Sequence, residues 1–152
     1  MAYRIMFVGG GDASREVIAK AILDDRIRKS NTEGIEVKAR GIVVLFQEPV
    51  NTKVVTILKN NEVSLEYDCV FQLEQADVSE SDMIITMDEA QKQKVVSSFQ
   101  DVKNVFTLKE WAGEEGTLLD PYGKELMDYE YCFREIERLI DRAMSSQGGF
   151  HL

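Results

Sequence analysis

The sequence predicts an α/β fold, a three-layer sandwich in which a central parallel sheet of about four strands has helices on both faces. Three observations lead to this fold class. Short apolar segments at residues 4–8, 35–46, 82–87 and 104–108 have the composition of sheet strands. Segments with apolar residues at helical spacing separate them. Three consecutive glycines join the first strand to the first helix.

The first half of the chain alternates strands with helices. We predict a first helix over residues 15–28, closed by a polar stretch that ends at Gly34. At least one strand lies within residues 35–46, where apolar residues dominate. A second helix is predicted after Pro49, with the proline in its first turn. Residues 69–76 are predicted to form a short third helix.

The second half continues the alternation. A strand at 82–87 leads to Asp88, the predicted N-cap of a further helix. A short strand follows at 104–108, and residues 113–123 are expected to form a loop. The last helix is predicted over residues 126–144, with its apolar residues along one stripe. Because strands and helices alternate at short spacing, the sheet should be parallel, with ligands at the C-terminal ends of its strands.

Composition limits the classes of function. The chain has 152 residues, the length of one domain, and we assign residues 1–146 to a single domain and 147–152 to a flexible tail. The net charge of −9 argues against binding to nucleic acid or to an anionic membrane. No apolar run approaches the roughly 18 residues of a membrane span. Cys69 and Cys132 lie far apart without a C-x-x-C pattern, which predicts a reduced, cytoplasmic protein with no metal site and no cofactor.

The glycine loop is the candidate site for an anion. Backbone N–H groups at the start of a helix attract phosphate, and a neighbouring arginine adds a planar fork of donors. The candidate residues are Gly10, Gly11, Asp12, Ala13, Ser14 and Arg15. Asp12 and Glu16 oppose this reading, because two carboxylates would repel a dianion unless they point outward into water.

Several features resemble one enzyme family in their order along the chain. Phe7-Val8 is followed by a loop and Arg15, the apolar segment 84–88 lies mid-chain, and Asp120-Pro121-Tyr122-Gly123 lies late in the chain. This arrangement resembles the low-molecular-weight protein tyrosine phosphatases, a family that includes bacterial protein arginine phosphatases and, more distantly, arsenate reductases. The resemblance extends over nearly the whole chain.

The resemblance implies roles for individual residues. In the family, a nucleophilic cysteine stands six residues before the phosphate-binding arginine and forms a phosphocysteine intermediate, while the aspartate of an Asp-Pro motif acts as general acid. Arg15 and Asp120 match the arginine and the acid. Gly9 stands where the nucleophile is expected, so the thiolate is missing.

Three further positions of the loop depart from the family pattern. The family's asparagine corresponds to Asp12, its second cysteine to Ser14, and the hydroxyl residue after the arginine to Glu16. The sequence therefore predicts a phosphatase fold that has lost the family reaction, a pseudophosphatase that binds a phosphate, another anion or a protein partner.

Two other functions remain open. The first is residual hydrolysis of phosphomonoesters, phosphotyrosine or phosphoarginine, in which water or Ser14 attacks, Arg15 holds the phosphoryl group and Asp120 is the acid. The second is nucleotide binding by the glycine-rich loop, with Glu36 near the place of a ribose-binding acid.

Each site residue also has a purely structural interpretation. The glycines can form a strand-to-helix turn without a ligand. Arg15 can pair with Glu16 or another carboxylate at the start of the helix, and Asp120 can initiate a turn before its proline.

Overall fold

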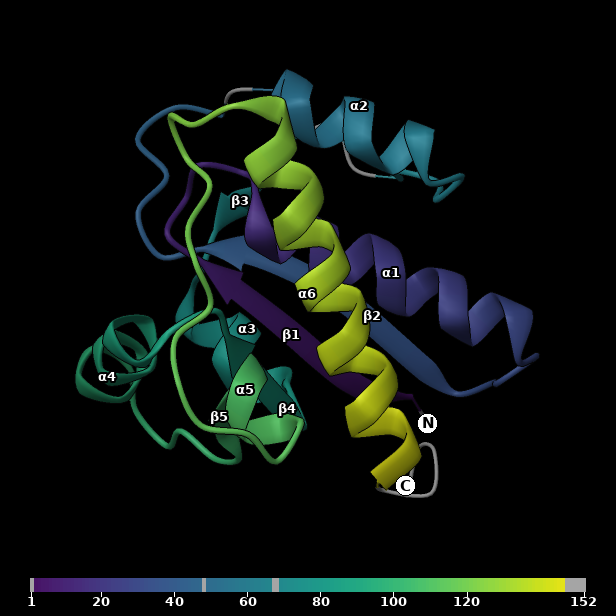
Figure 1. Ribbon diagram of the computed structural model, residues 1–152. Coiled ribbons are helices and arrows are strands. Elements are labelled where there is room, and N and C mark those ends of the chain that lie inside the picture. The colour runs from purple at the N-terminus through teal and green to yellow at the C-terminus, as the bar shows by residue number, and fades with distance from the viewer. Residues whose placement is uncertain (1, 48, 67–68, 147–152) are drawn as a thin grey trace.

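One parallel sheet forms the centre of the molecule. The computed structural model describes residues 2–47, 49–66 and 69–146 (Figure 1). The sheet has five strands in the order β3-β2-β1-β4-β5, and every neighbouring pair is parallel. The strands are β1 (Tyr3–Gly9), β2 (Ile35–Gly41), β3 (Phe71–Gln72), β4 (Met83–Thr86) and β5 (Val105–Thr107). The α/β prediction is confirmed, with one more strand than the four expected, because β3 is only two residues long.

Helices cover both faces of the sheet. They are α1 (Arg15–Lys29), α2 (Thr52–Asn60), α3 (Gln75–Glu80), α4 (Glu89–Ser98), α5 (Leu108–Trp111) and α6 (Leu126–Ser146). None of these described helices is both long and apolar enough to cross a membrane. Figure 1 shows α6 lying across one face of the sheet, beside α1.

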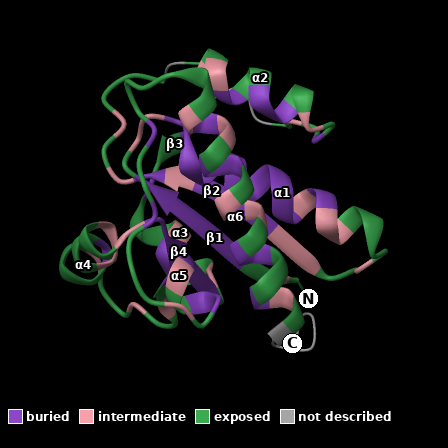
Figure 2. Cartoon of the chain, in the orientation of Figure 1, coloured by how far each residue is buried: buried purple, intermediate pink, exposed green. Residues whose placement is uncertain are grey.

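Alternate side chains of β1 belong to two separate apolar cores. Ile5 and Phe7 join the larger core with residues of α1, α2, α5 and α6. Met6 and Val8 join a smaller core with residues of α3 and α4 on the other face. This alternation follows from the period of two along a strand. The central strand is buried on both faces (Figure 2), and it ends at the glycine loop.

Two predictions between the second and fourth strands are wrong. The second helix starts at Thr52 instead of Pro49, because the Asn51 side chain caps it by accepting a hydrogen bond from the Lys53 N–H at 2.9 Å. Pro49 lies outside the helix and forms an isolated antiparallel bridge with Cys69. The predicted helix at 69–76 is replaced by β3 and, after it, α3.

Two further differences concern the ends of elements. The predicted loop follows a short helix, α5, which the sequence reading missed and which a reciprocal cap between Thr107 and Glu110 stabilises. The tail predicted at 147–152 lies outside the described residues.

The apolar run after β2 leaves the sheet and follows the glycine loop instead. Ile42 N–H donates to Gly9 O at 2.9 Å, and Val43 N–H donates to Gly10 O at 3.3 Å. Beyond them, Leu45 is 82% exposed and Phe46 is 77% exposed. An apolar sequence therefore forms one wall of a surface pocket instead of a strand.

Candidate functional site

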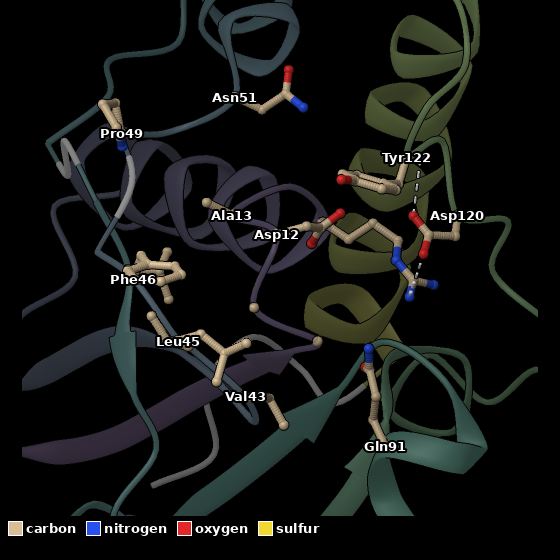
Figure 3. A pocket seen from close by; sticks show the side chains of 15 residues that line it. Asp12, Ala13, Val43, Leu45, Phe46, Pro49, Asn51, Gln91, Asp120 and Tyr122 are labelled. Carbon is tan, nitrogen blue, oxygen red and sulfur yellow. Dashed lines mark hydrogen bonds and ion pairs between the residues drawn. The ribbon is translucent and has the colours of Figure 1, made fainter.

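A pocket of about 600 Å³ opens beside the glycine loop, at the C-terminal end of β1. Six parts of the chain contribute to it: the loop with the start of α1, the apolar residues after β2, the approach to α2, Val70 before β3, Gln91 of α4 and the Asp120 turn (Figure 3). The lining residues are Gly10, Gly11, Asp12, Ala13, Arg15, Val43, Val44, Leu45, Phe46, Pro49, Asn51, Val70, Gln91, Asp120 and Tyr122. This is the position at which parallel α/β sheets bind ligands.

Close backbone contacts explain why glycine is needed at the centre of the loop. Gly11 has φ of 121°, and a Cβ at this position would lie 2.0 Å from Val43 O. A Cβ at Gly41, the last residue of β2, would lie 2.7 Å from the Gly11 Cα. The loop and the end of β2 therefore touch backbone to backbone, which no other residue type allows.

The space beside Gly9 is filled by the side chain of Glu16. A Cβ at Gly9 would lie 1.6 Å from Glu16 Oε2 and 2.3 Å from its Cδ. Glu16 reaches back from the first turn of α1 into the loop, where its Oε1 accepts a hydrogen bond from the Ser14 N–H at 2.7 Å. The carboxylate thus occupies the place that any side chain at Gly9 would need.

The carboxyl group of Glu16 is held in an unfavourable setting for a charge. The residue is 0% exposed, and Oε2 has no hydrogen-bond partner among the residues that the structure describes. Burial, followed by the charge of Asp12, raises the pKa of the Glu16 carboxyl to about 7. The alternative that Glu16 points outward into water is therefore wrong.

Arg15 is held in place by protein groups. Its Nη1 donates to Leu118 O at 3.0 Å, and its Nη2 donates to Asp88 Oδ2 at 3.0 Å. Asp120 Oδ2 lies 3.6 Å from the same Nη2. Arg15 does pair with carboxylates, but these are Asp88 before α4 and Asp120 before α6, and not Glu16 or another carboxylate at the start of α1 as predicted.

Asp120 and Asp12 face the pocket from opposite segments (Figure 3). Asp120 both forms its turn, accepting a hydrogen bond from the Tyr122 N–H at 3.1 Å, and lies near Arg15. Asp12 is half-buried, and this burial raises the pKa of its carboxyl. In the described part of the chain, no cation lies within ion-pair distance of Asp12.

The remaining candidate nucleophiles are poorly placed. Ser14 is 0% exposed, which removes its hydroxyl from contact with a ligand in the pocket. Cys132 lies on α6, where burial raises the pKa of its thiol to about 12, so it carries no thiolate at neutral pH. Cys69, the other free cysteine, is half-buried.

Glu36 is far from the place that nucleotide binding requires. It lies one residue into β2, paired across the sheet with Arg4 near the start of β1, and its carboxylate is 3.6 Å from that arginine. The glycine loop pairs with the opposite end of β2 at Gly41. The two features on which the nucleotide hypothesis rests therefore lie at opposite ends of the sheet.

Sequence reading missed several residues of the site. Asp88 was predicted only as an N-cap; it does cap α4 through Gln91 N–H at 2.8 Å, and it also holds Arg15. The strand predicted within residues 35–46 is β2, which ends at Gly41, and the apolar residues 43–46 that remain form the wall, a role that the sequence did not indicate. No group of three or more metal-ligating side chains occurs within 2–47, 49–66 and 69–146.

Comparisons with known proteins point to one family. Residues 4–147 match the profile described as "Low molecular weight phosphotyrosine protein phosphatase". A protein-arginine-phosphatase of Geobacillus stearothermophilus is 28% identical over 144 residues, covering 93% of this chain and 94% of the relative. The low molecular weight protein-tyrosine-phosphatase PtpB of Staphylococcus haemolyticus is 27% identical over 139 residues, covering 91% and 96%.

The fold agrees with this match. The crystal structure of a low molecular weight protein tyrosine phosphatase from T. tengcongensis superposes with a TM-score of 0.88 at 26% identity, covering 95% of this chain and 99% of the other.

Proposed function

The chain belongs to the low molecular weight phosphotyrosine protein phosphatase family, and we propose that it is a pseudophosphatase within it, a member that binds through its pocket without hydrolysing phosphate esters. Its relatives bear the names of tyrosine and arginine phosphatases. The proposal concerns what this chain retains of their chemistry.

The observation that carries the proposal is the placement of Glu16. Its carboxylate fills the space beside Gly9, 1.6 Å from where a Cβ would lie, and its Oε1 already accepts the Ser14 N–H of the loop. A carboxyl group thus stands in the loop where an incoming phosphoryl group would need a nucleophile and donors. Phosphate would have to displace or neutralise it.

Neither of the groups considered as a replacement nucleophile supports turnover. A thiol with a pKa of about 12 is protonated at neutral pH, which applies to Cys132. Ser14 is buried, and a serine needs an adjacent base to become nucleophilic. Glu16 itself is sealed beneath the loop.

A hydrolysis assay tests the proposal. p-Nitrophenyl phosphate, phosphotyrosine and phosphoarginine are offered between about pH 5 and pH 8, a range that spans the expected acid and base pKa values. The protein-arginine-phosphatase of Geobacillus stearothermophilus serves as the active control. We expect no turnover above the uncatalysed rate for the natural chain.

The same assay tests the second candidate, residual hydrolysis, which the proximity of Arg15 Nη2 and Asp120 Oδ2 at 3.6 Å favours. Turnover that falls in Asp120→Ala would establish that candidate and overturn the pseudophosphatase proposal. Turnover indifferent to Asp120→Ala would indicate a contaminating phosphatase, to be resolved by repeating the assay on protein purified by a second route.

A further inference from the structure

We propose that the pocket beside the glycine loop accepts a cationic side chain, a lysine or an arginine of a partner protein, in place of a phosphate. This inference rests on the proposed function and names the ligand class of the same pocket. Three observations support it: the state of the pocket's own cation, the state of its carboxylates and the nature of its walls.

Positive charge is scarce in this pocket. Arg15 is the one cationic side chain among the described lining residues, and only 6% of it is exposed. Its guanidinium is committed to Leu118 O and to Asp88, each at 3.0 Å. An incoming anion would have to share this guanidinium with Asp88 and Asp120, and it would meet the repulsion of Asp12.

Negative charge, in contrast, is in excess, because the single guanidinium of Arg15 faces Asp88 at 3.0 Å, Asp120 at 3.6 Å and the charge of Asp12. Asp12 is half-buried and lies beyond ion-pair distance of every cation in the described residues. Asp120 adds a second, half-exposed carboxylate across the pocket. Beneath the loop, Glu16 Oε2 is fully buried without a described hydrogen-bond partner. Carboxylates removed from water stabilise a cation placed between them and repel an anion.

The walls of the pocket can pack against the methylene groups of a basic side chain and against apolar residues next to it. Leu45 and Phe46 are the exposed apolar residues on one side, and Tyr122, 64% exposed, stands across the pocket next to Asp120 (Figure 3). The methylene groups of lysine or arginine pack on apolar surface while the charged end reaches a carboxylate. The ring of Tyr122 offers a face for a cation.

A protein segment is the occupant that these features fit. The pocket of about 600 Å³ is larger than one side chain, so apolar residues beside the basic one can cover Leu45 and Phe46. The net charge of −9 of the whole chain attracts basic partners over a longer range.

Binding of small cationic probes tests the inference. Nα-acetyl-arginine amide and Nα-acetyl-lysine amide are titrated to about 20 mM, a range suited to weak single-side-chain contacts, against ¹⁵N-labelled protein. Nα-acetyl-citrulline amide is the neutral control, and inorganic phosphate and Mg²⁺ are the competing ligands. We expect saturable shifts at residues 10–13 and 43–46 with a cationic probe and none with citrulline or phosphate.

Charge-removing variants locate the site. Asp12→Asn keeps the size of the side chain, and we expect it to weaken binding of the cationic probe by about fivefold or more. Glu80→Gln removes an exposed carboxylate from the end of α3 and should leave binding unchanged. Thermal unfolding of both variants checks that they remain folded, as the comparison requires. Asp120→Asn removes the carboxylate on the other side of the pocket and should also weaken binding of the cationic probe.

The outcomes separate this inference from the pseudophosphatase proposal. Saturable phosphate binding at residues 10–13 without binding of either cationic probe would overturn the inference and leave the proposal intact. Failure of both cationic probes to shift these residues, or an equal effect of Glu80→Gln and Asp12→Asn, would also overturn it. Stronger shifts with Mg²⁺ than with either probe would mean that the pocket binds a metal ion and not a basic side chain, which would overturn the inference. Turnover in the hydrolysis assay would overturn the underlying proposal.

Discussion

Glu16 Oε2 lies 1.6 Å from the point that a Cβ on Gly9 would occupy, so residues 9 and 16 share one volume. The glycine at the end of β1 is therefore tied to a side chain on the first turn of α1. This relationship explains the absence of a side chain at position 9 without reference to a turn or a positive φ, and it leads directly to the first prediction.

Gly9→Ala should lower the free energy of unfolding by about 1–3 kcal/mol, the usual cost of overpacking a buried position. Gly10→Ala is the matched control, because the nearest atom to its Cβ would be Gln91 Nε2 at 3.7 Å, and it should cost less than about 0.5 kcal/mol beyond the general glycine effect. Urea denaturation of both variants measures the difference. Adding Glu16→Ala to Gly9→Ala should recover part of the loss, and equal effects of the two single alanine variants would contradict the shared-volume interpretation.

Glu16→Gln should change how stability depends on pH. The pKa of the carboxyl rises from its usual 4.5 to about 7 in the folded state, so the natural protein gives up stability as pH rises through this range. The free energy of unfolding falls by about 3 kcal/mol in total, and most of this fall occurs between pH 5 and pH 8. In Glu16→Gln this loss should be absent, so the variant should be the more stable protein at pH 8. Parallel pH profiles of the two proteins in urea denaturation would rule out the raised pKa.

Restoring a thiol alone should not restore hydrolysis. Gly9→Cys meets the Glu16 carboxylate sterically, and the nearby charges of Glu16 and Asp12 raise the pKa of a thiol. The combination Gly9→Cys, Glu16→Ser and Asp12→Asn removes both obstacles, and we expect p-nitrophenyl phosphate turnover in this triple variant only. Brisk turnover by Gly9→Cys alone would contradict the prediction, and a fall on adding Asp120→Ala would confirm the acid in the triple variant.

Arg15→Ala should destabilise the protein by about 2 kcal/mol, because Leu118 O and the partly buried carboxylate of Asp88 lose their partner. Arg134→Ala is the matched control: its pair with Glu130 lies on the surface of α6 at 3.2 Å and should matter by less than about 0.5 kcal/mol. Thermal or urea unfolding compares the two. If Arg15→Ala lowered the free energy of unfolding as little as Arg134→Ala does, Arg15 would contribute little to the stability of the fold, and a role in ligand binding would be favoured.

Most of the fold was predictable, because strong strands and helices carry their own periodicity. The glycine loop, the central apolar strands and α6 follow from local patterns. Within residues 42–76 only α2 was expected, with a different start, since the other assignments depend on contacts distant in sequence. Ile42 N–H donates to Gly9 O at the end of the neighbouring strand, and Pro49 forms a bridge with Cys69. No local pattern contains those partners.

Only part of the site was predictable. The family resemblance assigned Arg15 and Asp120 to one site, and their side chains lie 3.6 Å apart, whereas the role of Asp88 and the wall at 43–46 were not expected. The direction of the Glu16 side chain was not predictable either, because a carboxylate at the first turn of a helix is expected to face water or cap the helix. Only the folded loop shows that it turns inward beside Gly9.

The shared volume of residues 9 and 16 also makes the two positions a coupled pair. While a side chain occupies position 9, a glutamate at 16 cannot adopt the inward position seen here. A side chain introduced at 9 meets the Glu16 carboxylate in the same way, and one of the two has to move. A substitution at either position therefore changes which side chains the other can accommodate.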